Sequence, residues 1–416
     1  MLPVDQAEAL ILNTVQAFDR PEEIETVDLF AASGRILAET AVSTLDFPHW
    51  DNSAMDGYAV RFDDVKAAQT ENPVSLEVVE EIPAGYQPTK TIQPGQAARI
   101  FTGAVMPAGA DTIVIQEDTQ ALDDRVQVLA APSKQGAFVR HQASFYQAGT
   151  PLLSPGICLQ AAEIAVLAAA QCDRIQVYRR PKVAILSTGN ELVTPDQPLK
   201  PGQIVDSNQY ALASLVQQAG AIPVPLGIVP DRPKALKGAI AQACAQADVI
   251  LSTGGVSVGD YDYVDRILND LGATLHIRSV AIKPGKPLTF ATIPAAASNQ
   301  RPSLYFGLPG NPVSSLVSFW RFVQPALRKL SGRSENWLPS FISVPTQTDL
   351  RAGGQRETYL WGKLSLENGR YTFDLASGSH SSGNLVNLAS CNALAIVPVG
   401  QRHISAGTEV QVMQVR

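Results

Sequence analysis

The sequence predicts a multidomain protein of the α/β plus β class, in which a parallel sheet is flanked by β-rich segments. Between residues 183 and 271, strand-type and helix-type patterns alternate, as they do in βαβ units. Short β-type runs separated by Gly and Pro dominate residues 74–129 and 341–416. A chain of 416 residues has enough material for about two to four domains with separate cores.

The first third of the chain predicts two helices separated by a β-rich module. Apolar residues recur at helical spacing over residues 4–18, which is typical of an amphipathic helix. Turn-forming residues at 48–53 lead into the module. Its predicted strands are residues 74–79, 98–101, 112–116 and 126–129. The second helix is expected over residues 160–170.

The middle of the chain, after a predicted boundary at residues 179–181, carries the parallel sheet. The predicted strands are residues 183–187, 224–228 and 249–251. The predicted helices are residues 208–219, 234–247, 262–271 and 313–330. Gly220 and Gly272 follow two of these helices, where glycine commonly ends a helix.

Three turns rich in Gly and Pro are the most informative local feature. They occupy residues 254–262, 283–287 and 307–312, and each directly follows a short apolar β-type run. In an open parallel sheet such turns lie along one edge, where ligands bind. Glycine lets backbone N–H groups approach an anion, and lysine adds a compact positive charge. The set therefore predicts a phosphate or oxyanion site.

Composition excludes several classes of function. The net charge of -7 argues against general affinity for nucleic acid or for anionic membranes. The start of the chain lacks the basic region of a secretory signal, and the apolar stretch 157–170 is too short to span a bilayer. The 4 Cys and 5 His are scattered, which favours a reduced, cytoplasmic protein without a zinc site.

Three carboxylates beside the predicted edge have both a structural and a chemical interpretation. Glu191 follows Thr188 and Gly189 and could stabilise the first turn of a helix or serve a site. Asp231, just before Arg232 and Pro233, could likewise cap a helix or serve a site. Asp262 could cap the helix 262–271, or it could hold Mg²⁺, which proteins often bind with one or two carboxylates plus substrate phosphates.

Other polar residues differ in how much the sequence says of them. Lys283 and Lys286 lie on a stiff Pro-Gly turn and are better explained as anion ligands than as solvated lysines. A semi-buried Asp56 would need a partner, but its role stays open, as does that of Arg356. His380 is interpreted as a surface loop histidine, and no catalytic triad, Walker loop or dinucleotide motif is found.

Taken in order, the motifs resemble those of the MoeA family of molybdopterin molybdenumtransferases, to which the E domain of gephyrin is similar. The resemblance covers essentially the full length. The segments that carry it are residues 51–59, 102–103, 187–189, 254–262, 283–287 and 308–312.

The resemblance implies four domains and a homodimer whose active cleft takes residues from both subunits. A discontinuous, mostly helical dimerisation domain would comprise residues 1–48 and 138–178, with an inserted β domain at 49–137. An α/β molybdopterin-binding domain would follow at 179–330, and a C-terminal β barrel at 338–416.

The implied activity is Mg²⁺-dependent insertion of molybdate into adenylylated molybdopterin with release of AMP. By resemblance, molybdate would be held by Lys283, Lys286, Arg356 and Ser379. Catalytic roles would fall to Asp56, Glu191, Asp231 and Asp262, with Asp262 and Glu191 as metal ligands. The residues implied to bind the adenylylated pterin are Thr102, Thr188, Gly254, Gly255, Ser257, Pro309, Gly310, Asn311 and Ser314. Molybdate is a tetrahedral dianion, so ammonium groups and a guanidinium fork suit it chemically.

The chain departs from the family pattern at two places. Asn190 stands where many members have Asp, and residues 143–145 read Ala-Ser-Phe where members carry Gly-Glu-Asp. The second departure puts the number of metal ions and the turnover rate in doubt. It leaves open a carrier or scaffold that kept the cleft but lost turnover. A nucleotide amidase that shares only the α/β domain is disfavoured by residues 51–59.

Overall fold

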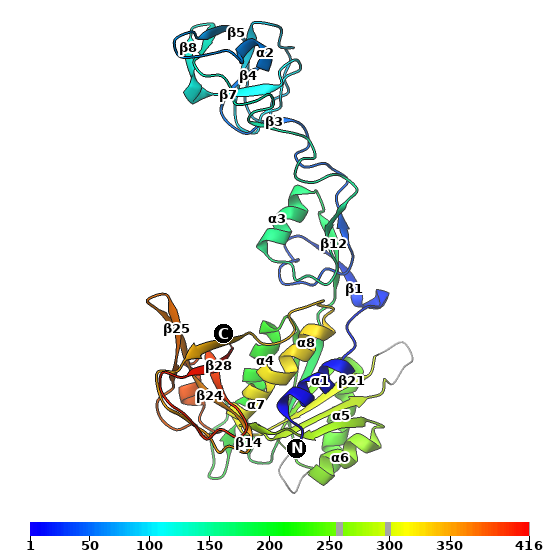
Figure 1. Ribbon diagram of the computed structural model, residues 1–416. Helices are drawn as coiled ribbons and strands as arrows, with labels where there is room; N and C mark the ends of the chain where they lie inside the picture. Colours follow the sequence, from blue (N-terminus) through cyan, green and yellow to red (C-terminus); the bar gives the residue numbers. More distant parts are fainter. Residues whose placement is uncertain (255–260, 296–300, 416) are drawn as a thin grey trace.

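The computed structural model describes residues 1–254, 261–295 and 301–415, which form four units in an elongated arrangement (Figure 1). The β unit (residues 52–140) lies at one end of the molecule. The middle unit (residues 24–47 and 146–178) joins it to the α/β unit (residues 1–18 and 182–330). The C-terminal unit (residues 341–415) lies beside the α/β unit. None of the helices in the described ranges has the length and apolar character needed to cross a membrane.

The β unit is built on a six-stranded sheet in the order β7-β4-β6-β5-β9-β8. The strands are β4 (Gly57–Val60), β5 (Val74–Ile82), β6 (Gln96–Ile100), β7 (Thr112–Ile115), β8 (Thr119–Leu122) and β9 (Arg125–Val128). A short helix α2 (Phe62–Val65) and the turn η2 (Gln116–Asp118) complete it. At its base β3 (Asn52–Ser53) pairs with β10 (Val139–Arg140), so the segments that enter and leave the unit lie side by side.

The middle unit contains less helix than the resemblance implied. The turn η1 (Pro21–Glu23) directly precedes it. Its own elements are β1 (Ile24–Asp28) paired with β12 (Arg174–Tyr178), β2 (Ala41–Val42) paired with β11 (Pro151–Leu153), and α3 (Ala161–Ala169). The expected helix at residues 4–18 is α1 (Val4–Thr14), and its apolar face packs into the core of the α/β unit instead. The middle unit therefore keeps only a small core around Leu37, Leu167 and Val177.

The α/β unit has a six-stranded sheet in the order β16-β13-β17-β21-β20-β18. β16 (Ile222–Val229), β13 (Lys182–Thr188), β17 (Val249–Thr253) and β21 (Ser303–Leu308) are parallel, as predicted. β20 (Pro287–Ile293) and β18 (Thr274–Ser279) add two antiparallel pairings. The prediction of a purely parallel sheet was therefore wrong at one side of the sheet.

Helices cover both faces of this sheet because successive strand residues point to opposite sides. Ile185 packs in the core shared with α1, α4 (Asn208–Gln218) and the helical segment 312–330, whereas Leu186 packs in the core shared with α5 and α6. The helices of that second face are α5 (Pro233–Gln246) and α6 (Tyr261–Asp270). A small pair of strands, β14 (Leu192–Val193) and β15 (Ile204–Val205), lies between β13 and α4.

The last helical segment of the α/β unit is not a uniform α-helix. It consists of α7 (Pro312–Ser318), a π-helical turn η3 (Phe319–Val323) and α8 (Gln324–Leu330). Pro325 has no N–H to donate to the preceding turn, and a wider turn directly before it accommodates that loss. The sequence pattern alone had predicted one continuous helix over residues 313–330.

The C-terminal unit adds its own sheet in the order β19-β24-β26-β28-β22, with β25 paired to β24. The elements are β22 (Phe341–Pro345), β23 (Leu350–Arg351), β24 (Glu357–Glu367), β25 (Arg370–Leu375), α9 (Leu385–Leu388), β26 (Ala393–Val397), β27 (His403–Ile404) and β28 (Glu409–Gln414). A single bridge between Thr346 and Phe373 brings the two ends of the sheet together. The first strand, β19 (Ile282–Lys283), comes from the α/β unit and pairs in parallel with Glu357–Thr358 of β24.

A buried ion pair fixes the segment that enters the middle unit. The carboxylate of Glu23, 3% exposed, contacts the guanidinium of Arg301, which also contacts Asp19. Backbone N–H groups of Asp19 and Arg20 donate to the same carboxylate at 3.0 Å. Burial alone would raise the pKa of Glu23, but Arg301 and these N–H groups outweigh it and hold that pKa below its ordinary value.

Arg301→Gln should therefore lower the free energy of unfolding by about 3 kcal/mol at neutral pH, because it leaves a buried carboxylate without its cation. A carboxylate with a depressed folded pKa contributes stability above its unfolded pKa, and the contribution is lost as pH falls through the folded pKa. The deficit of the variant should shrink over that acidic range in denaturant titrations. The control is Lys237→Gln, which removes an exposed ion pair with Asp270 and should cost less than about 1 kcal/mol. Equal effects of the two substitutions would contradict the assignment.

Candidate active site

Three parallel strands of the α/β sheet end side by side and form the floor of a cavity of about 630 Å³, the first cavity. β13 ends at Thr188, β17 at Thr253 and β21 at Leu308, and the register pairs Thr253 with Leu308. Ligand sites form at such carboxyl edges because the connecting turns diverge there. Of the residues predicted for the pterin, the structure places Thr188, Gly254, Pro309, Gly310, Asn311 and Ser314 in the lining, together with Glu191.

Glycine is required at position 254, directly after β17. The backbone of Gly254 has a φ of +83°, and a Cβ added there would lie 2.2 Å from the carbonyl oxygen of Thr188. No side chain fits at that distance. The glycine thus lets the ends of β17 and β13 approach each other closely, which shapes the floor of the first cavity.

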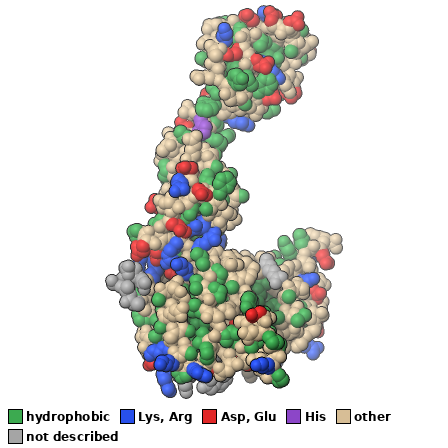
Figure 2. Space-filling view, turned by 180° about the vertical axis from the view of Figure 1, so that it is seen from behind, with side chains coloured by type: hydrophobic (Ala, Val, Ile, Leu, Met, Phe, Trp, Pro, Cys, Tyr) green, Lys and Arg blue, Asp and Glu red, His purple; other side chains and the backbone are tan. Residues whose placement is uncertain are grey.

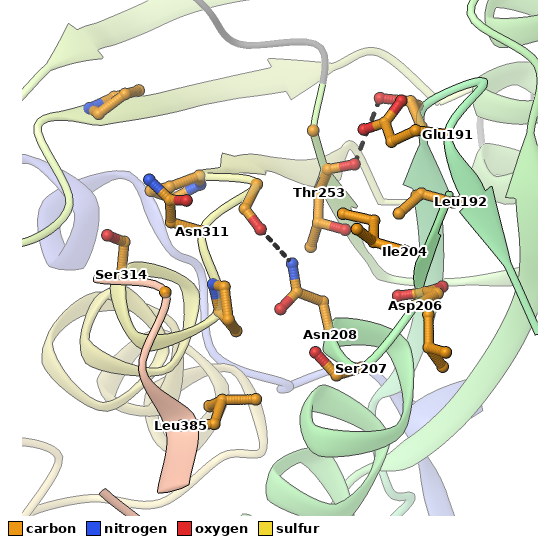
Figure 3. Close-up of a pocket in the computed structure, with 18 residues that line it drawn as sticks. Glu191, Leu192, Ile204, Asp206, Ser207, Asn208, Thr253, Asn311, Ser314 and Leu385 are labelled. Atoms are coloured by element: carbon orange, nitrogen blue, oxygen red, sulfur yellow. Dashed lines mark hydrogen bonds between the residues drawn. The ribbon is translucent and has the colours of Figure 1, made fainter. Parts of the chain in front are cut away.

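Hydrogen bonds fix the walls of the first cavity (Figure 3). Asn208, at the start of α4, donates through Nδ2 to the carbonyl of Gly310 at 2.8 Å. The hydroxyl of Thr188 donates to the carbonyl of Thr253 at 3.3 Å. Figure 3 shows Asn311 and Ser314 on one side of the cavity and Glu191, Leu192 and Ile204 on the other. The cavity therefore has a polar side and a partly apolar side.

Two carboxylates line the first cavity, and sequence reasoning found only one of them. Glu191 was predicted, and its carboxylate lies over Gly189, where an added Cβ would come within 2.7 Å of both oxygens. Asp206 was missed, although it directly follows β15. Asp206 is 2% exposed and accepts from the N–H of Gln209 at 3.2 Å. Polar residues between a short strand and a helix were the available signal.

A second cavity of about 530 Å³ adjoins the first and is lined by cations. Pro287, Asn311 and Ser314 line both cavities, so the two share part of their walls. The cationic residues of the second cavity are Lys283, Lys286, Arg351 and Arg356. Among the described residues that line it there is no carboxylate. The arrangement suits an oxyanion, because ammonium and guanidinium groups offer charge and several donors.

The turn at residues 283–287, which carries Lys283 and Lys286, lies at the predicted edge of the α/β sheet, but the strand that leads to this edge is not the predicted one. The strand before it, β18, ends at Ser279, so the expected run 280–282 is not part of that sheet. β20 is antiparallel to both β18 and β21, so β18 ends at the same edge as β21. The run instead contributes Ile282 and Lys283 to the sheet of the C-terminal unit. Arg356 Nη1 donates to the carbonyl of Ile282 at 3.2 Å and joins the two units at the second cavity.

The C-terminal unit supplies residues that the sequence did not identify. Arg351 lines the second cavity, and so does the pair formed by Trp361 and His380, whose ring centroids are 4.4 Å apart. His380 lies in a loop, as predicted, but its imidazole is half-buried and bonds the carbonyl of Ala376 at 2.8 Å. Ser379 itself is not in the lining, although its neighbours Ser381 and Ser382 are.

Asp56 and Thr102 lie in the β unit, at the other end of the chain from both cavities (Figure 1). Asp56 accepts from the N–H and from the hydroxyl of Thr102, both at 2.7 Å. These two bonds hold the pKa of Asp56 below its usual range. The sequence indicated that a semi-buried Asp56 would need a partner without naming one, and in the structure that partner is Thr102. Within one chain the two residues do not contact the other predicted site residues.

The remaining predicted carboxylates are placed as follows. No helix follows Glu191, since residues 192–205 contain β14 and β15, so the helix-capping interpretation of Glu191 was wrong. Asp231 lies outside both linings, and its N–H donates to Asn190 Oδ1 at 3.3 Å. Asp262 belongs to α6, but its side chain is outside what the structure describes. Gly255 and Ser257 also lie outside the described residues.

The segment 143–145, where the family pattern has two acids, lies at the junction of the middle and β units. The ring of Phe145 packs against Phe47 with centroids 5.8 Å apart. Both rings line an apolar hollow of about 380 Å³ together with Val166. This segment therefore presents apolar surface instead of carboxylates.

The donors present are compatible with Mg²⁺ held mainly by a substrate. The first cavity offers the carboxylates of Glu191 and Asp206, and no cluster of three or more metal-binding side chains occurs in the described ranges. Mg²⁺ is usually bound by one or two carboxylates plus substrate phosphates. The cavity fits that mode and not a dedicated cage of protein ligands.

Three family models match consecutive parts of the chain. The MoeA N-terminal region (domain I and II) matches residues 2–170. A probable molybdopterin binding domain matches residues 184–329, and the MoeA C-terminal region (domain IV) matches residues 343–415. The match to the molybdopterin binding domain covers the strands that form the first cavity.

Proteins of the same name in several organisms resemble nearly the whole chain. A molybdopterin molybdenumtransferase of a Nostoc species is 61% identical over 405 residues, which are 97% of this chain and 92% of that protein. The molybdopterin molybdenumtransferase of Haemophilus influenzae is 32% identical, covering 99% and 98%. The crystal structure of the molybdopterin biosynthesis moeA protein of Pyrococcus horikoshii superposes with a TM-score of 0.83 at 28% identity, covering 100% of both chains.

Gly254→Ala should lower the free energy of unfolding by at least about 2 kcal/mol, because it combines a left-handed backbone with a steric clash against Thr188. Gly238→Ala is the matched control, since a Cβ at this position in α5 would have no atom within 4 Å. That control should be neutral or stabilising by up to about 1 kcal/mol. Denaturant titrations of both variants test the difference, and a Gly254 variant as stable as the control would contradict the close approach.

Proposed function

The chain belongs to the MoeA family of molybdopterin molybdenumtransferases and is an enzyme of molybdenum cofactor biosynthesis; we propose that it inserts molybdate into adenylylated molybdopterin and releases AMP. The observation that best supports this reaction is the adjacency of the two cavities, which share three lining residues. One cavity carries cations only, and the other carries carboxylates at the end of a parallel sheet. An oxyanion and a nucleotide-bearing pterin could therefore lie next to each other.

Molybdate would bind in the second cavity. Lys283 and Lys286 lie on the turn before β20, and Arg356 approaches from the C-terminal unit. A tetrahedral dianion can accept from ammonium groups and from a guanidinium fork at once. Because the cations come from two units that are joined at β19 and β24, the charge is in place before the anion arrives.

The adenylylated pterin would bind in the first cavity, with its dithiolene directed toward Asn311 and Ser314, which border both cavities. The two dithiolene sulfurs would replace oxygen ligands of molybdenum, and the protons and oxygens would leave as water. Water would then cleave the pyrophosphate bond, so that AMP leaves and the pterin keeps its own phosphate. The chain would act chiefly by positioning the reactants and by neutralising charge.

Mg²⁺ would be held in the first cavity by Glu191, with Asp262 as the second expected ligand. When bound, it would stabilise negative charge on the leaving phosphate. The other groups of the cavity have separate tasks: Asn208 holds the turn at Gly310 in place, and the floor at Gly254 lets phosphate oxygens approach the backbone.

A homodimer would bring Asp56 and Thr102 to the cavities of the other subunit, because within one chain they lie at the opposite end. The middle unit offers apolar surface for such an association. Phe30 is fully exposed, Val42 is 45% exposed and Val166, on α3, is 39% exposed. Exposed apolar side chains of this kind would be covered in such an association. The elongated shape would place each β unit next to a partner's α/β unit.

Lys283→Ala should raise the molybdate concentration needed for half-maximal AMP release by at least about tenfold, since a hydrogen bond to a charged group contributes about 1.5–3 kcal/mol. Binding of adenylylated molybdopterin should stay nearly unchanged. AMP release by the purified protein with Mg²⁺, with and without molybdate, measures the first, and equilibrium titration of the pterin measures the second. Lys363→Ala, an exposed lysine on β24, is the control.

The outcomes of that experiment separate the alternatives. Equal loss of molybdate use and pterin binding would contradict the assignment of Lys283 to molybdate. Tight pterin binding without any AMP release from the unmodified chain would favour a carrier, in which the apolar segment 143–145 replaces acids that turnover needs.

Mixing Asp56→Ala and Lys283→Ala chains should restore activity if Asp56 acts on the partner's cavity. After random exchange, half of the dimers contain one chain of each kind, and each of these has one site free of both substitutions. At a molybdate concentration well below the one that Lys283→Ala needs for half-maximal AMP release, the mixture should therefore release AMP at about one quarter of the rate of the unmodified protein, whereas each variant alone should release much less. A mixture no more active than the sum of its components would show that Asp56 does not act in this way.

A further inference from the structure

A third cavity, of about 360 Å³, lies where the middle unit joins the α/β unit and is lined by five arginines. They are Arg35, Arg179, Arg180, Arg328 and Arg333. Among the described residues that line it there is no Asp or Glu. Figure 2 shows Lys and Arg side chains together with Asp and Glu side chains around this junction on the rear face. The cavity shares no lining residue with the first or the second cavity.

Two of the five arginines are neutralised by carboxylates outside the lining. Arg35 contacts Glu25 and donates to the carbonyl of Tyr178 at 2.9 Å. Arg179 donates to both oxygens of Asp248, at 2.8 and 2.6 Å. The positive charges of Arg35 and Arg179 are therefore balanced by carboxylates of the protein itself.

The other three carry positive charge without a carboxylate partner in the described part of the chain. Arg328 donates through Nη1 only to carbonyl groups, those of Trp337 at 3.3 Å and Leu338 at 3.0 Å. The guanidiniums of Arg180 and Arg333 have no acceptor among the described residues. Burial and, to a smaller extent, the neighbouring charge of Arg333 lower the pKa of Arg328.

The ends of two helices compensate only part of this charge. α4 ends at Gln218 and α8 at Leu330, and the residues that follow each helix line the cavity. A helix C-terminus carries about half a negative charge, so two of them offset about one of three positive charges. The carbonyls of residues 215–217 and 327–330 already accept hydrogen bonds from within the chain. A net charge of about +2 therefore remains around an open cavity.

We propose that this third cavity binds a small phosphate-class dianion, either free phosphate or a phosphate monoester. A guanidinium presents two parallel donors that match a phosphate, and Arg180 and Arg333 have their donors free. The volume is sufficient for a small phosphorylated molecule. The net charge of the chain is -7, so the cavity is a local exception and not part of a general basic surface.

An anion there would connect two units. Gly34 and Cys158 belong to the middle unit, whereas Gln217 and Arg328 belong to the α/β unit, and all four line the cavity. Arg180 lies in the segment between the two units, Arg333 follows the α/β unit and Arg328 lies on α8, so a ligand that they hold would restrict the relative movement of the units. It would thereby restrict the position of the β unit that the middle unit carries.

Phosphate titrations of the full-length protein at low ionic strength test the proposal. Calorimetry should find two sites for inorganic phosphate per chain, one in the third cavity and one among the lysines of the second. The double variant Arg180→Gln/Arg333→Gln should weaken one site by about tenfold or more. Lys283→Gln/Lys286→Gln should weaken the other site. Arg370→Gln, an exposed arginine on β25, should change neither site.

Further measurements keep the result interpretable. Without phosphate, the double arginine variant should be at least as stable as the unmodified protein, because the substitutions relieve repulsion at Arg328. Arg180→Lys/Arg333→Lys should bind phosphate with intermediate affinity, because the charge remains and the fork is lost. Glycerol 3-phosphate in place of phosphate shows whether an ester is preferred at the same site.

Two outcomes would overturn the proposal. Phosphate isotherms of the double arginine variant that coincide with those of the unmodified protein would show that the third cavity is empty of anion. Complete loss of binding in Lys283→Gln/Lys286→Gln would show that all phosphate binds in the second cavity. Neither readout uses AMP release, so failure of this proposal is distinguishable from failure of the proposed reaction.

Discussion

The close approach of the ends of β13 and β17 is the constraint on which the site depends. Only a residue without a side chain can stand at position 254, because the carbonyl of Thr188 occupies the space that a Cβ would need. This contact sets the floor of the first cavity. The walls follow from it: Asn208 on α4 holds Gly310, and Gly310 in turn positions Asn311 at the entrance to α7. A shift of the floor would therefore move the wall that both cavities share.

The second cavity depends on a strand that leaves one sheet and joins another. β18 and β20 belong to the α/β sheet, but the turn between them sends Ile282 and Lys283 into the sheet of the C-terminal unit. The bond from Arg356 to Ile282 completes this joint. Cations from two units are thus brought together without any carboxylate among the described lining residues. Lys283, Lys286 and Arg351 are exposed and Arg356 is half-buried, so water screens part of their mutual repulsion, and the guanidinium and ammonium donors are accessible to an anion.

Sequence patterns predicted the strands and turns that depend on neighbouring residues, and they missed the site residues that are brought in by pairing between strands far apart in the chain. β13, β17 and β21 followed from apolar runs before glycine turns, and with them the position of Thr188, Gly254 and Asn311. Arg351 and the Trp361–His380 pair could not be found, because only the pairing of β19 with β24 brings the C-terminal unit to the lysine turn. The antiparallel strands β18 and β20 carry no local signal for their direction. The sequence also did not show that α1 packs in the α/β unit, because the apolar face of an amphipathic helix does not identify the core that it joins.

The junction between the middle and α/β units decides whether the two ends of the molecule can cooperate. Asp56 and its partner Thr102 lie in the β unit, which the middle unit connects to the α/β unit. The ion pair of Glu23 with Arg301 and the third cavity lie at the base of this connection. In a symmetric dimer, a small change of angle at this base would move the carboxylate of Asp56 by a larger distance, because the connection is long (Figure 1). The charge at the junction is therefore as relevant to the chemistry as the charge in the cavities. A site completed by a partner's residue, as proposed, would need a base that is stiff when the substrate is bound, and the ion-paired arginines at this base supply stiffness that a small apolar core cannot.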